Sequence, residues 1–236
     1  MRKLASLLAA PSGHVPHIRP AYRILSRAHA SVSGLLDAAE VLDEKRRSSN
    51  TSTKGRMSRL EVDVMRSALV LTSAGLDASM GRLVNDAGRA LAVKKGTGAR
   101  HQYEEYLKAE LAKPNVGTQW RDAIVSLSPG DALLKVYLAD RTKASLQGSG
   151  DLKSRVRNAL GIPQSVVQDS DLERLDEFFI ARNAISHDMD LKDPASNSIA
   201  RHHRTVEDVV ELSDRAFATA VLLIQGAADA CRRAKV

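Results

Sequence analysis

The residues best suited to chemistry lie in the segment Arg182–Asp188, which reads Arg-Asn-Ala-Ile-Ser-His-Asp. Arg182 supplies a permanent cation that can clamp a phosphate, and His187 supplies an imidazole that can move a proton near neutral pH. Asn183 adds an amide that can orient a phosphate or fix the histidine tautomer. An arginine and a histidine are sufficient for cleavage of RNA without a metal ion.

The spacing of these residues indicates a helical site. Asn183 and His187 are four residues apart, so they share one face of a continuous helix, and Arg182 lies about 100° round from Asn183. An arginine five residues before a histidine is a weak pattern by itself. Its context adds weight, because Ser170–Glu173 reads as a capping box that opens the helix and a polar loop follows from Asp188 to Asn197.

Two charged residues are predicted to support this site from an earlier helix. Asp77 sits within a long apolar stretch, where a carboxylate is unusual unless it has a partner. Arg66 lies eleven residues earlier and nearly in phase on the same helix. We expect Asp77 to restrain Arg182.

A second cationic cluster follows the polar loop and consists of Arg201, His202, His203 and Arg204. If these residues are functional, we expect them to contact RNA phosphates. The two histidines could be imagined as metal ligands together with His187, Asp188 and Asp190, but the spacing fits no established zinc pattern. We therefore predict no metal site and no cofactor.

The composition restricts the classes of protein and of partner. The 236-residue chain has 35 Lys and Arg against 28 Asp and Glu, a net charge of +7, and this excess favours a polyanion such as nucleic acid. Its aromatic content is only 3%, so Leu, Val, Ala, Ile and Met must form the core, which favours helices over sheets. Cys231 is the only cysteine, which excludes an intrachain disulfide and fits the cytoplasm.

Apolar residues recur at helical spacing through most of the chain, and no alternating strand pattern is present. Helices are predicted from about Ala21 to Arg47, from Met57 to about Lys94 and from Thr205 onward, with a polar loop at 48–55. The sequence thus predicts an all-α, elongated helical bundle. We expect residues 1–20 to be a flexible N-terminal arm and 21–236 a single domain, with a helical insertion at about 96–165. No stretch is long and apolar enough to cross a membrane.

The predicted insertion holds most of the aromatic residues. Such residues can stack on bases, but at this spacing they are more often core. They are Tyr103, Tyr106, Trp120 and Tyr137.

The Arg-polar-x-x-x-His motif near the end of a late helix, in an all-α chain, resembles the HEPN superfamily and most closely its RiboL-PSP-HEPN type. The stretch from Arg66 to Asp77 is similar to the earlier core helix of that family, whose polar residue often faces the motif. The resemblance covers about residues 21–230, although only Arg182, Asn183 and His187 match a named motif.

The resemblance implies a metal-independent endoribonuclease of the toxin or antiviral type, cytoplasmic and active as a homodimer with a composite site. In such a pair, His187 and its symmetry mate act as base and acid, and two Arg182 side chains stabilise the phosphorane. An antitoxin or another regulatory protein is a further expected partner.

Two alternatives remain open. One is a non-catalytic HEPN-like module that binds RNA or a protein. The other is a structural helical adaptor in which Arg182 pairs with Asp188 or Asp190 at a helix end.

Overall fold

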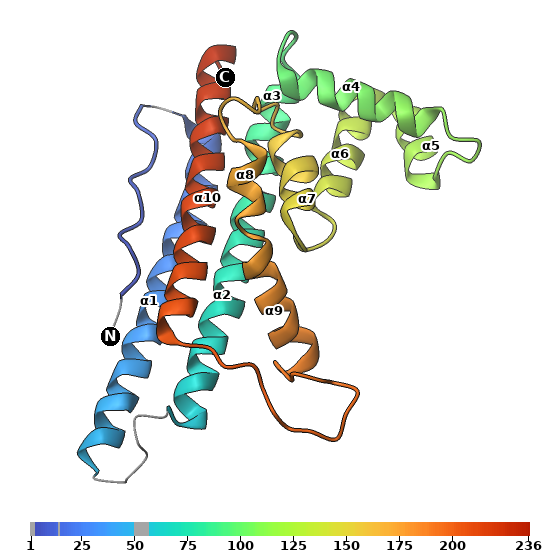
Figure 1. Cartoon of the computed structure of the whole chain (residues 1–236). Helices are drawn as coiled ribbons and strands as arrows, with labels where there is room; N and C mark the ends of the chain where they lie inside the picture. The colour runs from blue at the N-terminus through green and yellow to red at the C-terminus, as the bar shows by residue number, and fades with distance from the viewer. Residues whose placement is uncertain (1–2, 14, 50–56) are drawn as a thin grey trace.

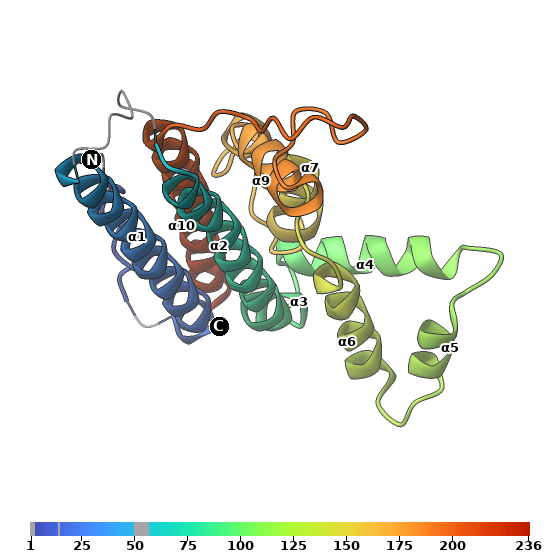
Figure 2. The ribbon, with the colours of Figure 1, turned by 90° about the horizontal axis from the view of Figure 1, so that it is seen from below.

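Three long helices, α1 (Arg19–Ser48), α2 (Arg59–Leu83) and α10 (Val206–Ala234), lie side by side and form the body of the molecule (Figure 1, Figure 2). The computed structural model describes residues 3–13, 15–49 and 57–236. Within these ranges the fold is all-α, as predicted, and the only strand-like pairing is an isolated bridge between Leu191 and Arg201. Part of the predicted loop at 48–55 lies outside the described residues.

The shorter helices complete the structure. They are η1 (Pro16–Ile18), the π-helical turn η2 (Val84–Gly88), α3 (Arg89–Ala92), α4 (Gly98–Leu111), α5 (Thr118–Ile124), α6 (Pro129–Thr142), α7 (Ser149–Asp151), the π-helical turn η3 (Leu152–Arg157), α8 (Asp169–Glu173) and α9 (Asp176–Asp188). In the described part of the chain, no helix is long and apolar enough to span a membrane.

Helix α2 is the central helix, and its sequence explains its start and its packing. Ser58 and Glu61 form a reciprocal capping box that satisfies two free backbone N–H groups at its first turn. Gly75 allows α1 to approach closely, because a Cβ at this position would lie 2.2 Å from the Cβ of Ala28. One turn further on, the Ser79 hydroxyl donates to the carbonyl of Ala21 at 2.9 Å. These contacts align the first half of α1 with the second half of α2.

Helix α10 confirms the amphipathic pattern in its sequence. Thr205 and Asp208 cap its first turn, and the predicted apolar stripe is buried except for Leu212, which is half-buried. The stripe ends at Cys231, where burial raises the pKa of the thiol to about 11. The thiol is therefore protonated and unreactive near neutral pH.

The predicted insertion corresponds to an arm of α4, α5 and α6 that projects from the bundle, followed by α7 and η3 (Figure 2). The backbone enters and leaves this region at one point, since a Cβ built on Gly98 would lie 2.9 Å from the carbonyl oxygen of Gly161. The aromatic residues pack on one another, with ring centroids 5.2 Å apart for Tyr103–Tyr137 and for Tyr106–Tyr137. Their role in the core is confirmed.

Residues 3–13, expected as part of a flexible arm, lie extended along α1 and α10. The backbone N–H of Ala5 donates to Asp214 at 2.9 Å, and the Tyr22 hydroxyl donates to the carbonyl of Leu8 at 2.8 Å. Arg232 in α10 donates to the carbonyl of Ser12. The sequence did not predict the contacts of Tyr22 and Arg232, because their acceptors are backbone carbonyls, which every residue has.

The region before the candidate site differs from the prediction. The capping box is formed by Gln168 and Asp171, not by Ser170 and Glu173. The helix that it opens ends at Glu173, and a turn separates it from α9. The apolar residues Leu172, Leu175 and Phe179 of this segment are buried.

Candidate functional site

Helix α9 carries all three residues of the Arg-x4-His motif. It is continuous from Asp176 to Asp188, so Asn183 and His187 lie one turn apart on the same face, as predicted. Arg182 points elsewhere, because five residues of α-helix place it about 140° round the axis from His187. Its side chain is buried, whereas His187 is exposed. A single chain does not bring the two together.

The guanidinium of Arg182 is held by the loop that connects the arm to the body. It donates to the carbonyl oxygen of Leu146 and, at 3.5 Å, to Oε1 of Gln147. It also lies 5.9 Å from the centroid of the Phe179 ring. Its Nε is buried and has no hydrogen-bond partner in the described part of the molecule.

Asp77 binds the same loop residue from α2, because its Oδ1 accepts the backbone N–H of Leu146 at 2.8 Å. Burial raises the pKa of Asp77 above its usual value, although the Leu146 N–H and the charge of Arg182 act in the opposite direction. The expected restraint of Arg182 by Asp77 therefore takes an indirect form. Among the described contacts the two side chains share Leu146 and form no direct ion pair.

Asn183 and His187 face outward. Asn183 is half-buried, and its Oδ1 is buried without a partner among the described residues. No hydrogen bond or ion pair of the His187 ring is found in the described structure. Ile180, one turn before Asn183 on this outer face, is 69% exposed. The outer face of α9 thus presents a free imidazole and an exposed apolar side chain, while the unsatisfied amide oxygen of Asn183 lies beneath the surface.

Arg66 does not support Asp77 as expected. Its Nε donates to Asp190 Oδ2 at 2.8 Å and its Nη1 to Asp63 at 3.0 Å. Asp190 is completely buried and also accepts two bonds from Arg204, at 2.9 and 2.6 Å. The helical phase of Arg66 and Asp77 indicates only that they share a face of α2. The ion-pair partner of Arg66 is Asp190, which lies 124 residues away in the sequence.

This cluster, the Asp190 clamp (Arg66, Asp190 and Arg204), fixes the chain just after α9. Met189 and Asp190 have positive φ values of 52° and 61°, which reverse the chain at the helix end. The backbone N–H of Asp190 donates to the carbonyl of Ala184 at 2.8 Å. The alternative in which Arg182 pairs with Asp190 is wrong, since the carboxylate is already occupied by Arg66 and Arg204.

The four residues predicted to bind RNA divide into two pairs. Arg204 belongs to the Asp190 clamp, and Arg201 donates to Asp63 at 2.9 Å. His202 and His203 are exposed, and His202 lines a crevice of about 360 Å³ between α9 and α10. The two arginines therefore have structural contacts, while the two histidines are available to a ligand. In the described part of the chain no group of three or more His, Cys, Asp or Glu side chains could hold a metal ion.

Leu146 and Gln147 were not predicted, and Asp190 was considered only as a metal ligand or as the partner of Arg182. Leu146 acts through its backbone, so its side-chain type carries no signal for this contact. The partners of Asp190, Arg66 and Arg204, come from other parts of the chain.

No protein-family model, curated protein sequence or solved structure gives a significant match to this chain. The similarity to the HEPN superfamily consequently rests on the motif and the helical class alone.

Proposed function

We propose that this chain is a metal-independent endoribonuclease of HEPN type that acts in the cytoplasm as a homodimer. The observation that carries the proposal is the outer face of α9, where His187 and Asn183 lie beside the exposed Ile180. In a homodimer that pairs this face with its symmetry mate, Ile180 would be buried beside His187. A two-fold axis near this face would set two His187 side chains opposite each other.

The reaction needs no group beyond those of the two chains and the RNA. One His187 removes the proton of the 2′-hydroxyl, the 2′-oxygen attacks the phosphorus, and the bond from phosphorus to the 5′-oxygen breaks. The second His187 protonates the leaving oxygen. The products are a 2′,3′-cyclic phosphate and a 5′-hydroxyl.

Arg182 is assigned to the phosphate in the active form. In the structure it donates to a neutral carbonyl, that of Leu146. A charged phosphate oxygen is a stronger acceptor than a carbonyl. The proposal requires the guanidinium to leave Leu146 and turn towards the outer face of α9, where the RNA phosphate would bind it. Asn183 orients the phosphate or the imidazole.

The test is cleavage of a labelled RNA in the presence of EDTA. His187→Ala is expected to reduce the rate by about a hundredfold or more, because it removes both acid and base. His101→Ala, which removes an exposed histidine of the arm, is the matched control and should leave the rate unchanged. Ile180→Glu should lower both the sedimentation coefficient and the rate. Activity that persists in His187→Ala, or that disappears with EDTA, contradicts the proposal.

A second candidate is a non-catalytic module that binds RNA or a protein. It is favoured by the burial of Arg182, whose side chain is only 6% exposed. This function would be identified if the wild type and His187→Ala bind RNA with equal affinity and neither cleaves it. If the protein is a toxin, the wild-type chain should be recovered poorly from a bacterial host, and His187→Ala should restore the yield. An antitoxin that restrains it would be identified by co-purification.

A further inference from the structure

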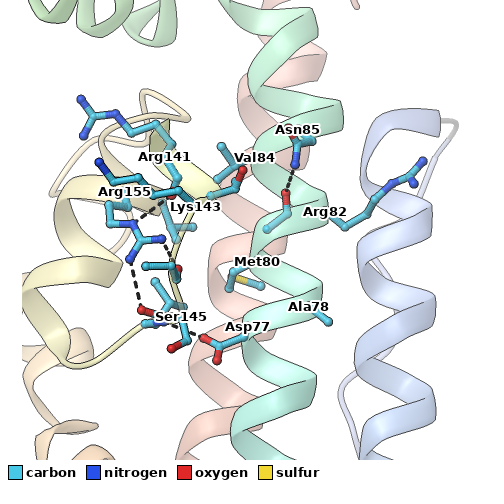
Figure 3. Close-up of a pocket in the computed structure, with 15 residues that line it drawn as sticks. Asp77, Ala78, Met80, Arg82, Val84, Asn85, Arg141, Lys143, Ser145 and Arg155 are labelled. Atoms are coloured by element: carbon cyan, nitrogen blue, oxygen red, sulfur yellow. Dashed lines mark hydrogen bonds between the residues drawn. The ribbon is translucent and has the colours of Figure 1, made fainter. Parts of the chain in front are cut away.

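A crevice of about 440 Å³ lies between the second half of α2 and the segment that follows α6 (Figure 3). Its lining includes four cationic side chains, Arg82, Arg141, Lys143 and Arg155, and one acidic side chain, Asp77. Arg82 extends on the side of α1, and Arg141 lies on the opposite side (Figure 3). Arg82 therefore points away from the segment that follows α6.

The floor of the crevice is open to a ligand. It is formed by small or polar residues of α2, namely Ala78, Gly81 and Asn85. A Cβ built on Gly81 would meet no atom within 4 Å, so this part of α2 is not packed against another element.

The four cations have different roles. Arg155 shapes the wall, because it donates to the carbonyls of Arg141, Ala144 and Ser145 at the end of α6. Arg141 is held flat, with its guanidinium carbon 4.0 Å from the centroid of the Tyr106 ring. Its Nε is buried without a partner among the described residues. A stacked guanidinium is pre-oriented for a planar, bidentate contact with a phosphate.

The other two cations are easily exchanged. Lys143 pairs with Asp140 at 2.6 Å and Arg82 with Asp86 at 2.6 Å, and their side chains are 69% and 52% exposed. Exposed pairs of this kind contribute little free energy, so a phosphate can take either cation from its carboxylate at small cost.

The cations of the crevice do not converge on one point, since Arg82 and Arg141 extend to opposite sides of α2 (Figure 3). Spread cations suit the successive phosphates of a polymer, whereas a small anion is usually held by converging groups.

We propose that the α2 crevice binds the phosphodiester backbone of single-stranded nucleic acid. Contact is made through phosphates, so binding has little sequence preference. The assignment of RNA as the natural strand rests on the function proposed above. The crevice is also connected to the motif, because Leu146 lines it and accepts the hydrogen bond from Arg182.

The test uses a fluorescent single-stranded oligodeoxynucleotide, which cannot be cleaved through a 2′-hydroxyl, and measures anisotropy over a range of salt. The triple variant Arg82→Gln, Arg141→Gln, Lys143→Gln is expected to bind about tenfold more weakly at 0.15 M salt. The slope of log K against log salt should fall by about 2, since each phosphate contact of a single strand contributes about 0.7.

The matched control is Lys108→Gln, Lys113→Gln, Arg121→Gln in the arm. It removes the same charge, and two of its cations are also paired with neighbouring glutamates, Lys108 with Glu105 and Lys113 with Glu110. We expect its affinity to stay within about twofold of the wild type, because these residues do not line the crevice. Equal losses in the two triples would mean that net charge alone controls binding and would overturn the proposal.

Two further measurements keep the test decisive. The double variant Arg82→Gln, Lys143→Gln keeps the Arg141 stack on Tyr106 and should still reduce the salt slope, by about 1.4. Polyglutamate that displaces the oligonucleotide as efficiently as RNA would identify an acidic protein as the ligand and contradict the proposal. His187→Ala should bind normally, so loss of cleavage and loss of binding are separate results.

Discussion

Two buried arginines, Arg66 in α2 and Arg182 in α9, have very different surroundings. Arg66, in the Asp190 clamp, has two carboxylates and a carbonyl as acceptors. Arg182 has a carbonyl and a side-chain amide, and its Nε is unsatisfied in the described structure. A fully satisfied buried ion cluster is a structural device, whereas an incompletely satisfied cation retains capacity for a ligand. Of the two arginines, Arg182 is therefore the one that retains hydrogen-bonding capacity for a ligand.

The largest expected effect follows from removing the shared carboxylate. Asp190→Ala leaves Arg66 and Arg204 buried without their main partner, and we expect a loss of about 3–5 kcal/mol in the free energy of unfolding. Urea denaturation measures this loss. Asp188→Ala removes an exposed carboxylate two residues earlier and should change stability by less than about 0.5 kcal/mol. Similar values for the two variants would show that the clamp does not hold the chain after α9.

A smaller effect is expected at the other arginine. Arg182→Met keeps most of the apolar stem and leaves the carbonyl of Leu146 without its donor, at a cost of about 1–3 kcal/mol. The same urea titration applies. If Arg182→Met costs as much as Asp190→Ala, the guanidinium is as structural as Arg66, and its assignment to a phosphate fails. A modest cost combined with loss of RNA cleavage sharpens the contrast.

The smallest effect concerns Asp77 and depends on pH. The folded state raises the pKa of Asp77 above its usual value of 3.8, so between the two values the folded chain retains a proton that the unfolded chain has released. Stability therefore falls as pH rises through this window. Asp77→Asn keeps an oxygen for the Leu146 N–H and has no carboxylate to ionise.

Thermal unfolding measured from pH 3 to pH 8 follows this difference. Asp77→Asn should gain stability relative to the wild type as pH rises above about 3.8 and keep a constant lead once the folded Asp77 is ionised. A lead that shrinks with rising pH would mean that the attraction of Arg182 exceeds the cost of burial.

The sequence predicted those features that depend on periodicity. The all-α class and the buried stripe of α10 follow from apolar residues at helical spacing, and both are confirmed. The four-residue spacing also placed Asn183 and His187 correctly on one face of a continuous helix.

The sequence could not predict the contacts that cross between distant segments. The phase of Arg66 and Asp77 suggested a common role, but each binds a residue from another part of the chain. Arg182 was expected to be restrained by Asp77, but its guanidinium donates to the backbone carbonyl of Leu146. A carbonyl oxygen belongs to every residue and therefore leaves no trace in the sequence.

The close backbone contact of Gly98 and Gly161 has a consequence for how this molecule can change. The two ends of the segment 98–161 touch, and the entropic cost of closing such a segment rises only slowly with its length. Its length and composition can therefore vary while the rest of the fold stays the same. The arm also supplies one wall of the α2 crevice and the loop that holds Arg182. Replacement of this single segment can therefore change the lining of the crevice and the contacts of Arg182 while α9 and His187 remain as they are.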